Sequence, residues 1–232
     1  MKPTTLTKSL LTFFGAAALA TSVQAATIVQ GGLDTIAFEA EIGSIDNTFD
    51  NAALGWEVDG VTAPLAGASG GSLVVAAENH SAAPANTITY NIDFTKTGNY
   101  DAWFRAAYTT QDYENFNDTA VNNDSFYYED GTIGDAPSWR EMNGISGLSD
   151  TVWLWFKGTT TVVVGSAGTT DWLISNREDG FIIDRLVLIH EDDVNPVNDA
   201  FLDGLSNSAV PEPSSAALLG VAGLALILRR KR

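Results

Sequence analysis

Carboxylates are the main groups in this sequence that could bind an ion or catalyse a reaction. The chain of 232 residues contains 29 Asp and Glu, two His and no Cys. The lack of cysteine excludes a disulfide framework, a thiolate metal site and a cysteine nucleophile. The acidic side chains are therefore candidates for binding a hard cation or for acid–base catalysis.

One acidic pair lies in the segment Phe38-Glu39-Ala40-Glu41. On a strand, Glu39 and Glu41 would share one face, while Phe38 and Ala40 would point into the core. Two carboxylates at this spacing repel each other unless a cation lies between them, and hard oxygen ligands suit calcium. The alternative is a solvated acidic edge without a metal.

A third carboxylate, Asp184, interrupts the apolar segment 181–189. A carboxylate on a buried strand needs a partner. Arg105, Arg177 or Arg185 could supply it as an ion pair. The alternative is a metal ion that Asp184 shares with the first acidic pair.

Aromatic residues form another candidate site. Tyr113 and Trp139 lie in polar segments that we expect to be loops. Sugar-binding proteins stack aromatic rings on sugars and add a few polar hydrogen bonds, so these two rings are candidates for polysaccharide contact. Tyr127 and Trp172 lie on expected strands and are assigned to the core, while Tyr128 could face either way.

No catalytic motif is present. The sequence lacks the nucleophile elbow of esterases, a phosphate-binding loop and the zinc-peptidase motif. His80 could act as a general base, and His190 is expected to be a surface residue at a strand end. A glycosidase needs only two suitably separated carboxylates, so a polysaccharide-acting hydrolase or lyase is the alternative to a non-catalytic protein.

The charge distribution narrows the class of partner. Residues 26–210 contain 28 acidic residues and six Lys or Arg. Such a body repels phosphate backbones, and nucleic-acid binding would need a basic stripe that the sequence lacks. Cations or neutral ligands are the expected partners.

The elements that would position these groups are short strands. Apolar residues alternate with polar ones at Ile88, Tyr90, Ile92 and Phe94, and no helical period is sustained between residues 27 and 207. This pattern predicts an all-β fold, a two-sheet antiparallel jelly-roll sandwich. The strands are expected at 35–41, 72–78, 87–94, 100–107, 123–129, 151–156, 160–165, 171–176 and 181–190.

The expected sandwich occupies residues 26–203, followed by a linker at 204–209. Turn signals separate the strands, for example Lys157-Gly158. The segments 43–71, 109–122 and 130–149 are rich in Gly, Asn, Asp and Ser, and we expect them to be loops at the ends of the sandwich, where ligands usually bind.

The first 25 residues have the pattern of a secretory signal. Lys2 and Lys8 precede and flank an apolar run at 10–20, and Val23-Gln24-Ala25 offers small residues at the spacing that a signal peptidase requires. Residues 1–25 are therefore expected to be removed by a signal peptidase as the protein is exported.

The last 23 residues have a different pattern. Val210-Pro211-Glu212-Pro213 precedes an uncharged segment at 214–228, and Arg229-Arg230-Lys231-Arg232 follow at once. The apolar segment is marginal for a transmembrane helix, and a basic cluster beside it marks the cytoplasmic side. The preceding sandwich is therefore expected outside that membrane.

This order of features resembles the PEP-CTERM sorting signal of Gram-negative bacteria. The resemblance implies an exosortase-type enzyme that cuts near the motif, with Val210-Pro211-Glu212-Pro213 as its recognition element and Arg229 and Arg230 behind the helix. It also implies anchoring in the inner membrane before sorting, and a final place in the cell envelope or extracellular matrix.

The central part of the chain resembles carbohydrate-binding modules of families 6 and 35, and the C-terminal sandwich of family 115 glycoside hydrolases. The likeness rests on Phe38-Glu39-Ala40-Glu41, on Gly98-Asn99-Tyr100-Asp101-Ala102-Trp103-Phe104-Arg105 and on residues 177–186. It implies that Glu39, Glu41 and Asp184 hold a structural calcium ion.

The resemblance also shows one departure in the sugar site. The position that carries a ligand-binding Asn in family 6 is Ile182, whose side chain cannot form a hydrogen bond. Asn176 could take over this role, which makes Tyr113, Trp139 and Asn176 the candidate ligand-binding residues.

Together these features predict an exported and sorted envelope or matrix protein. Its sandwich is expected to be non-catalytic, to hold calcium and to contact polysaccharide. The alternatives are the hydrolase or lyase described above, and a structural or adhesive surface protein that binds no sugar.

Overall fold

The computed structural model describes residues 26–31, 34–48, 55–59, 67–77, 83–109, 123–150 and 152–210. The expected signal peptide at 1–25 and the segment 211–232 lie outside these residues, as do Tyr113 and His80. Within the described ranges, no helix is long and apolar enough to cross a membrane.

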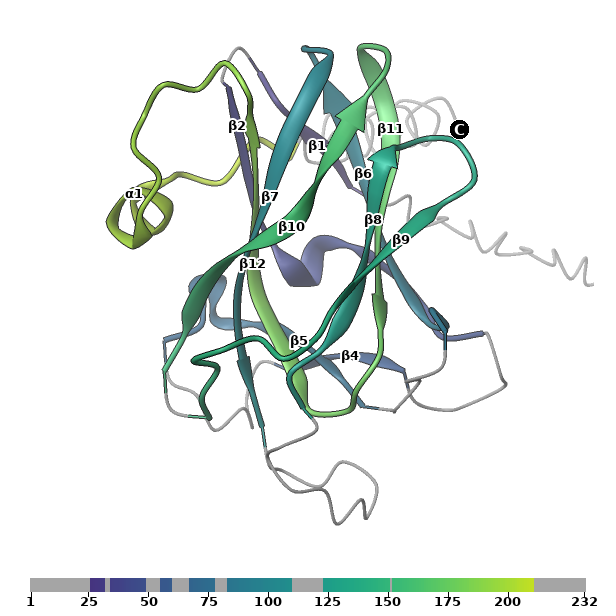
Figure 1. Ribbon diagram of the computed structural model, residues 1–232, viewed down its shortest axis with the longest axis vertical. Helices are drawn as coiled ribbons and strands as arrows, with labels where there is room; N and C mark the ends of the chain where they lie inside the picture. Colours follow the sequence, from purple (N-terminus) through teal and green to yellow (C-terminus); the bar gives the residue numbers. More distant parts are fainter. Residues whose placement is uncertain are drawn as a thin grey trace, which may run out of the picture.

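The protein is mostly β-structure, and its strands form a sheet that curls over on itself like a sandwich (Figure 1). One layer contains β1 (Thr27–Val29), β3 (Ser44–Asp46), β6 (Thr87–Phe94), β8 (Phe126–Thr132), β9 (Ser138–Met142) and β11 (Gly168–Asn176). The other contains β2 (Thr35–Glu39), β4 (Trp56–Asp59), β5 (Leu73–Ala76), β7 (Gly98–Tyr108), β10 (Leu154–Val164) and β12 (Phe181–His190).

The strand order explains how the two layers are connected. The order β1-β6-β11-β8-β10-β7-β12-β5-β4 runs through both layers, and β2 pairs with β12. β8 joins them through a short parallel pairing with β10. β1 is also parallel to β6, so the expectation of a purely antiparallel sandwich is corrected at two pairings.

Aromatic rings fill the space between the layers. The ring of Phe104 contacts those of Phe126, Tyr128, Phe156 and Trp172, with centroid distances of 4.8 to 6.1 Å. Rings packed at such distances in stacked, tilted or edge-on orientations add to the stabilisation that comes from buried area. Tyr128 therefore faces the core, and the core assignment of Trp172 is confirmed.

Long strands agree with the sequence pattern. The alternation at 87–94 corresponds to β6, whose even-numbered residues are buried, and 181–190 corresponds to β12, buried along its whole length. The expected loops, in contrast, contain β3, β4 and β9. These strands have three to five residues, which is too short for alternation to be visible.

The predicted turn at Lys157-Gly158 is wrong. β10 continues through it, and its pairing with β7 shifts register between Lys157 and Thr161. A Cβ at Gly158 would lie 2.8 Å from the hydroxyl oxygen of Tyr128. This glycine therefore allows a close approach between two strands, and it does not end a strand.

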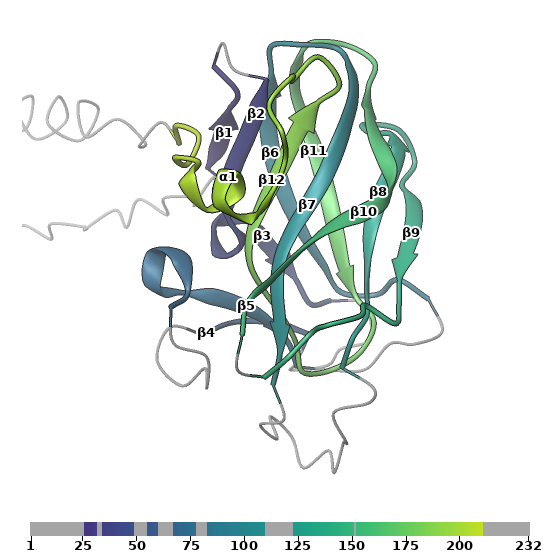
Figure 2. The same cartoon turned by 60° about the vertical axis from the view of Figure 1, so that its left-hand side comes forward.

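The expected linker lies against the sandwich. Helix α1 (Asp199–Gly204) begins at Asn198, whose side chain accepts a hydrogen bond from the backbone N–H of Phe201. Leu202 of α1 is fully buried beside Ala37 of β2 and Val187 of β12, and Figure 2 shows the helix next to these strands. The expected linker at 204–209 starts with the last residue of α1, and Ser208 and Ala209 are hydrogen-bonded to β2 and β1.

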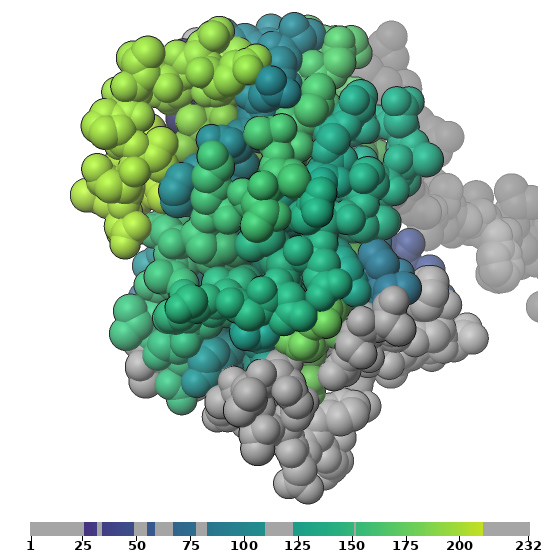
Figure 3. All heavy atoms as spheres, viewed as in Figure 1, coloured from purple at the N-terminus to yellow at the C-terminus, as the bar shows by residue number. Residues whose placement is uncertain are grey.

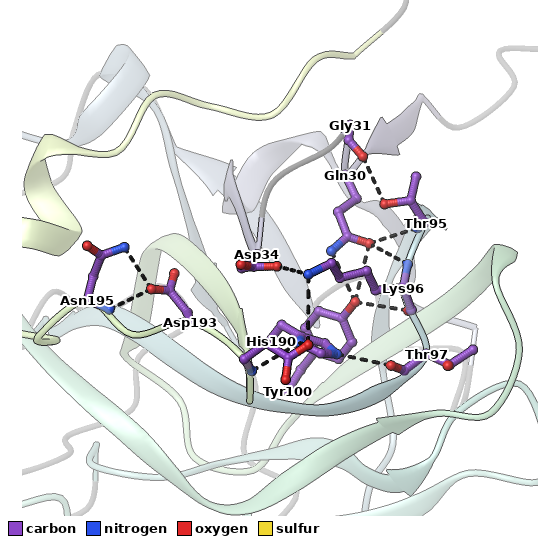
Figure 4. Close-up of polar contacts among 11 residues, drawn as sticks. Gln30, Gly31, Asp34, Thr95, Lys96, Thr97, Tyr100, His190, Asp193 and Asn195 are labelled. Atoms are coloured by element: carbon purple, nitrogen blue, oxygen red, sulfur yellow. Dashed lines mark hydrogen bonds and ion pairs between the residues drawn. The ribbon is translucent and has the colours of Figure 1, made fainter.

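A polar network closes one end of the sandwich (Figure 4). Gln30 accepts hydrogen bonds from the backbone N–H groups of Thr95 and Lys96, and its amide donates to the hydroxyl of Tyr100. His190 contacts the carbonyl of Thr97 at 3.0 Å and is 4% exposed. The expectation of a surface histidine is therefore wrong, because this end of β12 is covered by the 95–97 turn.

Candidate functional site

Three acidic side chains gather beneath one short turn. Glu39 ends β2, Glu41 lies in the 3-10 helix η1 (Ala40–Ile42), and Asp184 lies in the middle of β12. The turn above them is η2 (Ser69–Gly71). Glu41 is thus not on the same strand as Glu39, but the helical turn still leaves both carboxylates in one region while Phe38 and Ala40 point into the core.

Asp184 is fully buried and has two partners. Its Oδ1 accepts a hydrogen bond from Ser69 N (2.7 Å), and its Oδ2 pairs with Arg105 Nη1 (2.5 Å). Burial raises the pKa of Asp184 to about 6, although Arg105 and the Ser69 N–H act in the opposite direction. Of the three arginines considered from the sequence, Arg105 is the one that pairs with Asp184.

Glu39 and Glu41 each have a buried oxygen atom without a hydrogen-bond partner. Glu39 uses Oε1 to accept from Ser69 Oγ and Asn207 Nδ2, both at 2.7 Å. Its Oε2 and the Oε2 of Glu41 are buried and unpaired. Burial, with the nearby charges of Glu39 and Asp184, raises the pKa of Glu41 to about 7. Two unpaired carboxylate oxygens are unfavourable here without a cation.

Gly70 lies directly over this cluster. Its φ of +65° favours glycine, and a Cβ there would meet Glu41 Oε1 at 3.3 Å and Glu39 Cγ at 3.4 Å. Within the part of the chain that the structure describes, no group of three or more His, Asp or Glu is arranged to hold a metal ion. Both oxygens of Asp184 are bonded to protein, so the free oxygens belong to Glu39 and Glu41.

The predicted sugar-binding residues do not form one described cluster. Trp139 lies on β9, where it pairs with Glu129 and is partly buried, whereas the sequence suggested a loop. Asn176 is fully buried at the end of β11, and its Oδ1 accepts a hydrogen bond from Asn86 N. Ile182 is also fully buried, paired with Val75. Tyr113 lies outside the described residues.

A second acidic region lies where β8 separates from β11. A polar hollow of about 360 Å³ there is lined by Asn91, Glu129, Gly134, Asp135, Thr169, Thr170, Asp171 and Leu173. Glu129 is 1% exposed and accepts a hydrogen bond from Leu173 N at 3.1 Å. Burial, and to a lesser extent Asp171 and Asp130, raises the pKa of Glu129 to about 7. Sequence reasoning missed Glu129, because no motif distinguishes it from the many other carboxylates.

The raised pKa of Glu129 predicts that the stability of the fold depends on pH. Its pKa is higher in the folded chain than its usual 4.5, so the folded state is favoured while the carboxyl holds its proton, and this contribution is lost as pH rises through about 7. The free energy of unfolding of the wild type should therefore fall between pH 4.5 and 7.5. In Glu129→Gln this fall should be smaller by roughly 1–3 kcal/mol. Urea denaturation at each pH measures this.

The matched control is Glu141→Gln, which removes an exposed carboxyl from the neighbouring strand β9 together with its ion pair to Arg177 (3.1 Å). It should leave the pH profile close to that of the wild type. An unchanged profile in Glu129→Gln would contradict the assignment.

The C-terminal segment carries a motif that a comparison with known families identifies. Val210 packs against the main core, and the Val-Pro-Glu-Pro segment begins with it. The PEP-CTERM protein-sorting motif matches residues 209–232. This chain carries a PEP-CTERM sorting motif. The match covers the segment from the last residues of the sandwich through the basic cluster, as expected from the sequence.

The β-sandwich of this PEP-CTERM chain is similar to several solved structures. One is a family 26 mannanase with a family 35 carbohydrate-binding module from Podospora anserina, with 18% identity, a TM-score of 0.45, and coverage of 70% of this chain and 29% of the other. Another is the C-terminal family 6 module of a laminarinase from Zobellia galactanivorans, with 19% identity, a TM-score of 0.42, and coverage of 67% of this chain and 98% of the other.

A third similar structure is a family 35 carbohydrate-binding module from Clostridium thermocellum, with 16% identity, a TM-score of 0.44, and coverage of 66% of this chain and 96% of that one. The chain spans less than a third of the mannanase and of an isomalto-dextranase from Arthrobacter globiformis. No curated protein matches the sequence.

Proposed function

We propose that this is an exported protein of the cell envelope or extracellular matrix, sorted through its PEP-CTERM motif, with a non-catalytic sandwich. The observation that carries the proposal is the match of residues 209–232 to the sorting motif. A signal peptidase would remove residues 1–25, and an exosortase-type enzyme would act on the C-terminal motif. The apolar segment at 214–228 would anchor the protein in the inner membrane of a Gram-negative bacterium before sorting.

The proposal includes a structural calcium ion. Glu39, Glu41 and Asp184 would hold it, and the two unpaired buried oxygens of the glutamates support this role. Calcium takes six to eight oxygen ligands, so loop oxygens would complete its shell. The ion would supply charge compensation and would stabilise the contact between β2 and β12, which are already paired along residues 35–39 and 185–189.

The sandwich would also contact a polysaccharide through Tyr113, Trp139 and Asn176. The partly exposed ring of Trp139 supports it, since an aromatic ring can stack on the apolar face of a sugar. The burial of Asn176 means that its part in binding would require the end of β11 to open.

The sorting part is tested in the producing cell. Pro211→Ala combined with Pro213→Ala should abolish C-terminal processing and retain the chain in the inner membrane, because these residues form the recognition element. Mass spectrometry of the C-terminus and cell fractionation measure this. Pro196→Ala, in the exposed segment before α1, is the matched control and should be processed normally. Normal processing of the double variant would refute the proposed sorting.

The polysaccharide part is tested by retention on immobilised polysaccharides, with calcium and with a chelator. Trp139→Ala should lose at least about 1 kcal/mol of binding free energy, whereas Trp139→Phe should retain most of it. The same incubation separates the alternatives. Release of reducing ends would favour a hydrolase, and no retention on any polysaccharide would favour a structural or adhesive protein.

A further inference from the structure

The residues that lead into the sorting motif are bonded to the edges of both layers. We name residues 205–210 the C-terminal strap. Ser208 N donates to the carbonyl of Ala37 in β2 (2.7 Å), and the N–H of Val29 in β1 donates to the carbonyl of Ala209 (2.9 Å). β1 is an edge strand of one layer, and β2 pairs with β12 in the other. The strap therefore closes the seam between them.

A buried arginine holds the start of the strap. Arg185 donates to the carbonyls of Leu202 (3.3 Å) and Leu205 (2.5 Å) and to Asn207 Oδ1 (3.0 Å). Asn207 in turn donates to Glu39 Oε1. Hydrogen bonds from a charged group in a region with little water are strong, so the strap has a fixed course.

Further contacts hold the chain at both ends of the strap. Before it, Leu202 of α1 is buried, and Trp155 Nε1 donates to Asp203 Oδ1 at 2.8 Å. After Ala209, Val210 packs against the main core. Figure 3 shows the yellow residues, which end at residue 210, lying against the body of the protein. The first residue of the Val-Pro-Glu-Pro segment is thus part of the folded sandwich.

This arrangement conflicts with binding by a processing enzyme. An extended peptide is commonly bound through its main-chain N–H and C=O groups. The carbonyl of Ala209 accepts from β1 and the N–H of Ser208 donates to β2. This N–H is a single donor, so it cannot serve an enzyme at the same time. Cleavage of a segment held in a fold requires local opening.

We propose that the C-terminal strap is an intramolecular restraint on sorting. The sorting enzyme can bind residues 208–213 only after the strap leaves the edges of β1 and β2. Folding of the sandwich therefore slows processing. This inference rests on the proposed function and adds a regulatory step to it. Val210 belongs both to the motif and to the contacts with the core. Binding of the motif by the sorting enzyme therefore competes with packing of Val210 against the sandwich.

An engineered disulfide tests the restraint, because the chain contains no other cysteine. Val29 and Ala209 face each other across an antiparallel bridge, a position where a disulfide can form. In the producing cell, the full chain with Val29→Cys and Ala209→Cys should be processed at least about tenfold more slowly than the wild type, and dithiothreitol should restore the rate. Processing of the oxidised pair at the wild-type rate overturns the inference.

The single variants are the controls. Val29→Cys should be processed like the wild type, and Ala209→Cys, which lies inside the matched motif, measures the effect of that substitution by itself. If wild-type processing depends on Pro211 and Pro213 but the oxidised pair is processed equally fast, the restraint fails and the sorting function stands. If the proline variant is processed like the wild type, the proposed function itself fails.

A loosening variant provides an independent measurement. Asn207→Ala removes the bonds to Arg185 and Glu39 without touching the bonds of Ser208 and Ala209. It should speed processing about threefold or more, and hydrogen exchange of the Ser208 and Val29 amides should accelerate while β7 stays protected. Unchanged processing together with accelerated exchange overturns the inference.

Discussion

Replacing Arg105 with Met should lower the free energy of unfolding by about 3–5 kcal/mol in calcium-free buffer. Asp184 is fully buried, and the substitution leaves its carboxylate with the Ser69 N–H as its one remaining described hydrogen-bond partner. A buried charge without its counter-ion costs far more than the pair contributes. Urea denaturation followed by tryptophan fluorescence measures the loss.

The double variant separates the charge effect from lost packing. Arg105→Met with Asp184→Leu removes both charges, so it should recover most of the stability that Arg105→Met loses. A loss that is equally large in the double variant would show that packing of the arginine, for example over Trp153 (5.2 Å to the ring centroid), is the main contribution.

Calcium should raise the melting temperature of the wild-type protein. A ligand at a hundredfold excess over its dissociation constant stabilises the fold by about 2.7 kcal/mol, which corresponds to roughly 5–11 °C for a domain of this size. Glu41→Gln should abolish most of the rise, because it removes a carboxylate with an unpaired buried oxygen. Thermal melts with added calcium and with a chelator measure both effects.

Glu57→Gln, on β4, is the matched control for the calcium experiment and should keep the full rise. A wild-type protein that gains nothing from calcium, or a Glu41→Gln variant that gains as much as the wild type, would sink the proposed calcium site.

The sequence predicted the elements whose burial pattern is long and regular. β6 and β12 have eight and ten residues with clear apolar patterns, and both were predicted at their observed bounds. Strands such as β3 owe their existence to pairing with β6, and three residues carry no periodicity of their own. α1 is a single short turn stabilised by its docking, so its sequence shows no sustained helical period either.

The candidate site was predictable only in part, because its partners are distant in the chain. A buried Asp184 requires a cation or donor whatever the fold, so an arginine partner could be expected from the sequence. Ser69 and Asn207 could not, because they lie 30 and 168 residues from the Glu39 that they contact. Such contacts depend on the path of the loops, which composition does not specify.

The strap also determines when the protein can finish folding. An exported chain emerges from its N-terminus, so Val29 and Ala37 leave the translocation channel long before Ser208, which lies 171 residues after Ala37. Contacts over such separations form slowly, and unpaired strand edges invite pairing with other chains. The seam between the layers therefore stays open until Ser208 and Ala209 have followed and bonded to β2 and β1. During this interval the nascent protein is most exposed to aggregation.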